Sequence, residues 1–257
     1  MDKRIGAQYY TIREQSQNIK NFEAACKKVK EIGYKIVQIS GQPMAAAEMR
    51  PVLDDYDLKV VTTHRGFDDF LNRLDWVMDY NRTLGCELCG VGSMPKEYRG
   101  SSAKVSQFID EASGVAEKLK KEGLYFGYHN HAFEFAKLDD GKRTMDRLIS
   151  ETDPESFMFI ADTYWMQYGG VNPADFIRRL GSRAMAVHFK DMIIDPEKEF
   201  KPEMAEIGEG NLDWDAIVAA CDEAGVKWAL VEQDRSKRDP MESLKMSYDY
   251  LCGKGFN

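Results

Sequence analysis

The sequence predicts one α/β domain, residues 1–257, folded as a single eight-stranded (β/α)8 TIM barrel. The length of 257 residues is close to the roughly 250 residues that such a barrel needs. Helical and extended patterns alternate along the chain, with no linker rich in Pro, Gly or Ser between them. Polar and ionisable residues gather at the carboxyl ends of nearly all the predicted strands. In a barrel these ends converge on one mouth, where active sites lie.

The repeating unit of the chain is a helical pattern, a glycine and a strand. Asn172 and Pro173 open one helix in its cap and first-turn positions, and Gly181 follows its last apolar residue. In three other places apolar residues recur at helical spacing until a glycine ends the helix. These three helices cover residues 19–32, 105–119 and 214–221, and the glycines are Gly33, Gly123 and Gly225.

Eight extended segments complete the pattern. Eight strands alternating with helices permit either a closed barrel or an open doubly wound sheet. The polar strand ends favour the barrel, and the first strand lacks the GxGxxG motif of the dinucleotide-binding alternative. The predicted strands are Ile5–Gln8, Lys35–Ile39, Lys59–Thr63, Leu88–Val91, Leu124–His129, Met158–Asp162, Ala186–Lys190 and Ala229–Gln233.

Composition and charge narrow the possible ligands. Hydrophobic residues make up 43% of the chain, enough for a large core. The net charge of −8 would repel a nucleic-acid backbone or an anionic membrane surface, so a small neutral ligand fits better. No apolar run approaches the roughly 18 residues of a membrane span. The opening residues, Met1 to Arg4, lack the apolar stretch of a secretion signal, so a cytoplasmic location is expected.

Four inward-facing residues at strand ends predict a metal site. Side chains alternate along a strand, so the polar residues of these strands face inward and the bulky apolar ones face the helices. Separate hydrogen bonds would explain any one buried polar residue, but not four in matching positions. A shared cation removes the cost of burying them, and nitrogen and oxygen ligands suit Mn²⁺ first, with Zn²⁺, Co²⁺ or Mg²⁺ as alternatives. The predicted ligands of one divalent ion are His129, Asp162, His188 and Glu232.

Further polar and aromatic residues lie near these strand ends. Lys190 shares the inward face of His188, where its ammonium group would stabilise developing negative charge; a structural ion pair with Asp191 or Glu209 is the alternative. Trp165, with Tyr164 beside it, is expected to form a wall against the substrate, although ordinary packing would also place aromatic residues there. The predicted substrate-binding residues are Gln38, His64, Trp165 and Glu209.

These residues belong to an ordered set of motifs that spans nearly the whole chain. The motifs are "GAQYYTIRE" (6–14), "YHNHAFEF" (128–135), "ADTYW" (161–165), "VHFKD" (187–191), "GEG" (208–210) with "LDW" (212–214), and "VEQD" (231–234). The set resembles the sugar phosphate isomerase/epimerase group of the xylose isomerase-like TIM-barrel superfamily. The resemblance implies that Asp162, His188 and Glu232 bind the metal. It also implies a divalent-metal-dependent sugar isomerase or epimerase that acts through an enediolate, with Glu232 as base.

One position departs from that group and opens an alternative. His129 stands where many members carry a second glutamate. A proton transfer that uses two carboxylate bases would therefore lack its second base. The His-x-His at 129–131 also resembles the inosose dehydratases, so a keto-sugar or keto-polyol lyase or dehydratase is the alternative function. In it, His131, with an ordinary pKa near 6.5, would be the catalytic acid. Glu134 would either bend back to supply the missing carboxylate or remain a solvated loop charge.

Two other classes of protein share features with this sequence. An abasic-site endonuclease of the same barrel ancestry would need more metal ligands and basic loops, which this acidic chain with four histidines does not provide. A barrel that binds a sugar without converting it would hold metal but catalyse no proton exchange. The expected partner is a small sugar or polyol. The sequence leaves open which sugar it is, whether it is phosphorylated, which metal is native and whether the chain forms a homo-oligomer.

Overall fold

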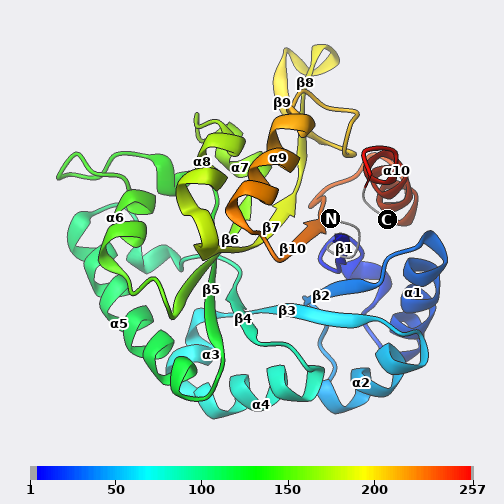
Figure 1. The fold of residues 1–257 in the computed structure, drawn as a ribbon, viewed down its shortest axis with the longest axis horizontal. Helices are drawn as coiled ribbons and strands as arrows, with labels where there is room; N and C mark the ends of the chain where they lie inside the picture. The colour runs from blue at the N-terminus through cyan, green and yellow to red at the C-terminus, as the bar shows by residue number, and fades with distance from the viewer. Residues whose placement is uncertain (1–4, 256–257) are drawn as a thin grey trace.

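Eight parallel strands close into a barrel with helices around it (Figure 1). The computed structural model describes residues 5–255. Around the barrel the strands follow the order β1-β10-β7-β6-β5-β4-β3-β2. The predicted closed (β/α)8 barrel is therefore confirmed. The barrel strands are β1 (Ile5–Gln8), β2 (Ile36–Ser40), β3 (Lys59–Arg65), β4 (Leu88–Val91), β5 (Tyr125–His129), β6 (Phe157–Asp162), β7 (Ala184–Phe189) and β10 (Trp228–Val231).

The helices follow the strands in turn, and the predicted ones are confirmed. Gly33 ends α1 at a φ of 124°, and Gly225 ends α9 at a φ of 71°, conformations that favour glycine. Asn172 caps α8, where its side chain accepts the Asp175 N–H. The α-helices are α1 (Ile19–Ile32), α2 (Ala46–Asp55), α3 (Phe67–Asn72), α4 (Leu74–Leu84), α5 (Ser102–Lys121), α6 (Thr144–Glu151), α7 (Thr163–Tyr168), α8 (Pro173–Leu180), α9 (Trp214–Ala224) and α10 (Pro240–Gly253).

Two apolar clusters divide the inside of the barrel from the layer between strands and helices. The small inner cluster includes Ile160, Ala186 and Leu230, which alternate with residues of the large outer cluster such as Val187 and Val231. The predicted inward and outward faces are thus confirmed. The inner cluster forms the floor of the barrel, and the polar strand ends lie above it at the mouth.

A two-stranded antiparallel hairpin follows β7 and was not predicted. It consists of β8 (Asp191–Asp195) and β9 (Lys201–Ala205), with Asp191 opposite Ala205. In Figure 1 it projects from the barrel beside α9. Its turn contains Glu199 and Phe200 at φ values of 55° and 59°, a left-handed conformation that is uncommon outside glycine. Residues 202–204 of the hairpin line a cavity together with Asp234, which follows β10.

Within residues 5–255, no helix has the length and apolar character needed to cross a membrane. The opening segment, Met1 to Arg4, on which the expected absence of a secretion signal rests, lies outside the described residues.

Candidate active site

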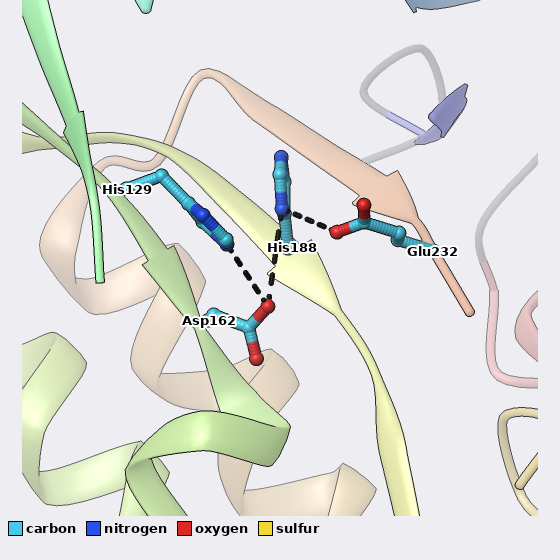
Figure 2. Close-up of side chains that lie close together, drawn as sticks. All are labelled: His129, Asp162, His188 and Glu232. Atoms are coloured by element: carbon cyan, nitrogen blue, oxygen red, sulfur yellow. Dashed lines mark hydrogen bonds and ion pairs between the residues drawn. The ribbon is translucent and has the colours of Figure 1, made fainter. Parts of the chain in front are cut away.

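Four residues from four neighbouring strands meet at the mouth of the barrel (Figure 2). His129 ends β5, Asp162 ends β6, His188 lies near the end of β7, and Glu232 follows β10. One potential ligand atom from each lies within 4.8 Å of the others, and all four side chains are buried. The structure therefore brings together the whole predicted ligand set.

The hydrogen bonds of the two histidines point their lone pairs into this cluster. His129 Nδ1 lies 2.9 Å from the Gly92 carbonyl oxygen, and His188 Nε2 lies 2.8 Å from Gln38 Oε1. Because both acceptors are carbonyl oxygens, these ring nitrogens donate their protons outward. The inner nitrogens then face carboxylates: His129 Nε2 is 3.1 Å from Asp162 Oδ2, and His188 Nδ1 is 2.7 Å from Glu232 Oε2. Each of these contacts needs either a second proton on the ring or a metal ion that both side chains bind.

Two further observations fit a divalent metal ion. His188 Nδ1 and Glu232 Oε2 are buried without a hydrogen-bond partner, although they lie at ion-pair distance. Lys190 Nζ lies 3.1 Å from Asp162, 3.0 Å from Glu232 and 2.9 Å from Asp234. The ionised carboxylates around this one ammonium exceed its charge, and a divalent cation would compensate the excess. The donor set, two imidazoles and two carboxylates, is one that such ions accept.

Lys190 and the carboxylates around it keep one another in their charged forms. Burial alone would lower the pKa of Lys190, but the surrounding carboxylates outweigh burial and hold that pKa well above its usual range. Burial alone would raise the pKa of Glu232, but the Lys190 ammonium and the His188 ring outweigh it and hold that pKa well below its usual range. The pKa of Asp162 is likewise lowered, with Lys190 opposing burial. Both carboxylates are therefore ionised, as metal ligands must be.

An active-site cavity of about 460 Å³ opens above the cluster. Of the four cluster residues only His129 and Glu232 line it; Asp162 and His188 do not. The predicted residues His64, His131 and Lys190 also line the cavity. Sequence reasoning missed several of its other lining residues, namely Tyr10, Ser40, Arg65, Ser93 and Asp234.

The surroundings of His131 shift its pKa from the expected value. Burial, together with the neighbouring His129, lowers the pKa of His131 to about 3. The ring lies 4.8 Å from that of His129 and 5.3 Å from that of Trp165. Burial therefore opposes the imidazolium form on which the predicted role of His131 as catalytic acid depends, and that role stays a prediction.

Four other predicted residues do not line the active-site cavity, and one of them, Trp165, lines a neighbouring cavity instead. Gln38 is fully buried behind His188, which it orients through the hydrogen bond described above. Glu134 accepts hydrogen bonds from the Tyr128 hydroxyl at 2.7 Å and from the His131 backbone N–H at 2.9 Å, and burial raises its pKa to about 8. It therefore supports the loop of His131 and does not supply the missing carboxylate. Glu209 is exposed and lies outside the cavity lining.

Asp191, the last residue of the "VHFKD" motif, holds the "GEG" and "LDW" segments next to that motif. Its buried carboxylate accepts hydrogen bonds from the backbone N–H groups of Gly208, Gly210 and Leu212, and from Trp214 Nε1 at 2.6 Å. Lys190, by contrast, has its ion pairs with Asp162, Glu232 and Asp234. The alternative ion pair of Lys190 with Asp191 or Glu209 is therefore wrong, and Asp191 anchors the loop after the hairpin.

We expect Asp191→Asn to destabilise the fold by about 3 kcal/mol, because an amide turns two donor hydrogens toward donors that now lack an acceptor. Urea denaturation measures the free energy of unfolding. Asp213→Asn is the matched control, since asparagine caps a helix about as well as the aspartate that now caps α9. Equal stability of the two variants would show that the Asp191 carboxylate is not an anchor.

Comparison with known proteins agrees with the fold. Residues 26–252 match the family described as xylose isomerase-like TIM barrel. An inosose dehydratase from Lacticaseibacillus casei is 24% identical over 90% of this chain and 88% of its own length. A sugar phosphate isomerase/epimerase from Parabacteroides distasonis superposes with a TM-score of 0.80 at 20% identity, covering 98% of this chain and 94% of its own.

An L-ribulose 3-epimerase superposes with a TM-score of 0.74 at 16% identity, covering 99% of this chain and 94% of its own. At these identities the solved structures establish the shared fold and not a shared reaction. The family match spans most of the chain, from the middle of α1 to the end of α10. This chain therefore belongs to the xylose isomerase-like TIM barrel family.

Proposed function

We propose that this protein is a divalent-metal-dependent lyase that dehydrates a small keto-sugar or keto-polyol. The observation that carries the proposal is that one carboxylate and one imidazole, Glu232 and His129, are the cluster residues that line the cavity. Both nitrogens of His129 are engaged, one by Gly92 and one by the cluster, so His129 offers no second base. The likeness to inosose dehydratases over 90% of the chain supports the same conclusion.

Metal binding, proton removal and charge stabilisation would fall to different residues of the site. His129, Asp162, His188 and Glu232 would hold the ion, with Mn²⁺ as the proposed metal, and the bound ion would polarise the substrate carbonyl. Glu232, ionised and at the cavity surface, takes the proton from the carbon beside that carbonyl. Lys190 stabilises the negative charge that develops, because its ammonium group also lines the cavity.

The leaving hydroxyl needs a proton donor, and Asp234 is better suited to this role than His131. Asp234 lines the cavity, and burial raises its pKa even though the Lys190 ammonium opposes the shift. Its carboxyl group and that of Glu232 line the same cavity, so Asp234 can pass a proton to a hydroxyl that leaves a substrate held there. We therefore assign proton delivery to Asp234.

Isomerisation or epimerisation is the second candidate function, and Asp234 is the observation that favours it. An epimerase needs two proton carriers, and Glu232 with Asp234 would provide two carboxyl groups in one cavity. Both functions begin with proton removal by Glu232 and differ in what Asp234 does next. In both, the proposed ligand is a small sugar or polyol.

Incubation of the metal-loaded protein in D₂O with an inosose and with a panel of ketoses separates these functions. We expect a dehydrated, unsaturated product by NMR. Asp234→Asn is expected to slow dehydration about 10²-fold while deuterium exchange beside the carbonyl continues, because only the acid is removed. His131→Gln is the control and should retain dehydration. A deuterated epimer without any unsaturated product would reject the lyase and support the epimerase.

A further inference from the structure

A second cavity, of about 450 Å³, adjoins the active-site cavity. Tyr10, which follows β1, and Asp234, which follows β10, line both cavities. The two cavities therefore share part of their lining on the side of the active site where Asp234 lies. Each of the two is already as large as a small-ligand pocket, so a single sugar ring at the metal cluster leaves the second cavity unused.

Aromatic residues form one wall of the second cavity. Tyr164 and Trp165 contribute from α7, with ring centroids 4.8 Å apart and ring planes at 89°. The backbone N–H of Trp165 donates to Asp162 Oδ1 at 2.9 Å, so this wall is fixed to the metal cluster. Trp165 Nε1 is buried without a hydrogen-bond partner. A pyranose suits such a wall, because its C–H face stacks on aromatic rings and its hydroxyls accept hydrogen bonds.

Arg13 holds the boundary between the two cavities in place. Its guanidinium lies 4.2 Å from the centre of the Tyr10 ring, and it donates to the carbonyl oxygens of Tyr10 at 2.7 Å and Asp234 at 3.2 Å. Both residues shared by the cavities are thus tied to one side chain. A wall that is already ordered loses little conformational freedom when a ligand binds.

The remaining wall carries both signs of charge. Arg235 is exposed and makes no ion pair within the described part of the chain, and Glu203 comes from β9 of the hairpin. A guanidinium group donates hydrogen bonds and a carboxylate accepts them, and a sugar hydroxyl can do both. Arg13 and Arg235 balance the charges of Glu203 and Asp234, so the lining carries no excess charge that would select an ion, and aromatic rings with mixed polar groups fit a neutral sugar.

We propose that the second cavity binds a second sugar ring, linked through a glycosidic bond to the ring at the metal cluster. The substrate is then a two-ring saccharide. This inference rests on the proposed function of the first cavity and adds the class of substrate. Trp165 borders the second cavity, and its ring centre lies 5.8 Å from the Nζ of Lys190, which lines the first cavity.

Calorimetric titration of the metal-loaded protein with glucose, maltose, cellobiose and trehalose tests the proposal without requiring turnover. At least one disaccharide is expected to bind roughly tenfold or more tightly than glucose. Arg235→Trp, which places bulk at an exposed position of this wall, should abolish that advantage. Arg235→Ala should reduce it without adding bulk. Arg238→Trp, three residues further along and outside both cavities, is the matched control and should keep it.

The proposal is overturned if none of the three disaccharides binds more tightly than glucose. It is also overturned if the advantage survives in both Arg235 variants. Failure of the proposed function is distinguishable, because it would appear as absence of proton exchange with every ketose while the preference for disaccharides remained.

Discussion

Asp162→Ala and Glu232→Ala are expected to lose the bound divalent ion on dialysis, whereas the parent protein keeps about one ion per chain. Each substitution removes one of the two carboxylates that form the cluster together with His129 and His188. Elemental analysis measures the metal content. His131→Gln is the matched control, because the His131 ring lies 4.8 Å from that of His129 but contributes no atom to the cluster.

Removal of the metal is also expected to lower the melting temperature of the parent. Without a cation, the inner nitrogens of His129 and His188 face carboxylates, and the Lys190 ammonium stands alone against three of them. An ion present at a thousandfold excess over its dissociation constant stabilises the fold by about 4 kcal/mol. Full metal retention in both alanine variants, or an unchanged melting temperature after chelation, would contradict the assigned site.

The barrel and the cluster could be predicted because both depend on regular patterns. Helical spacing followed by a glycine locates elements such as α1 and α9 without knowledge of tertiary structure. Alternation along a strand then fixes which residues face inward, as for His188. Because parallel strands of a barrel all end at one mouth, inward polar residues at their ends must meet.

The errors at the site come largely from where strands end. The second strand was predicted to end at Ile39, which would place Gln38 at the mouth. It runs to Ser40, so Ser40 lines the cavity and Gln38 lies one layer deeper, against His188. In the same way β3 extends past Thr63 to Arg65, and Arg65 lines the cavity. A shift of one or two residues thus exchanges a cavity residue for a supporting one.

Residues in the connections could not be placed by periodicity. The hairpin β8–β9 starts two residues after β7 ends, and its strands lack a strong alternating pattern, so the segment resembled a loop. The sequence therefore suggested that Glu209 lies close to the mouth. In the structure, Asp191 binds the backbone of Gly208 and Gly210, and Glu209 between them lies outside the cavity lining. Asp234 was within reach of sequence reasoning, because it lies two residues after Glu232 and so on the same side of an extended segment.

Glu232→Gln is expected to reduce turnover by about 10²-fold or more, with a much smaller effect on substrate binding, because an amide cannot accept the substrate proton. The side chain keeps its size and one oxygen that can face the cluster. Rates must be normalised to the metal content of each preparation, since loss of the ion would mimic loss of the base. Deuterium exchange beside the substrate carbonyl reports the proton-removal step directly and should fall by the same factor as turnover.

Asp234→Asn is the matched control for this substitution. Asp234 also lines the cavity and forms an ion pair with Lys190 at 2.9 Å, but it is not part of the four-residue cluster. If Glu232 is the base, exchange continues in Asp234→Asn and stops in Glu232→Gln. The reverse pattern, with exchange lost only in Asp234→Asn, would assign the base to Asp234 and leave Glu232 as a metal ligand alone.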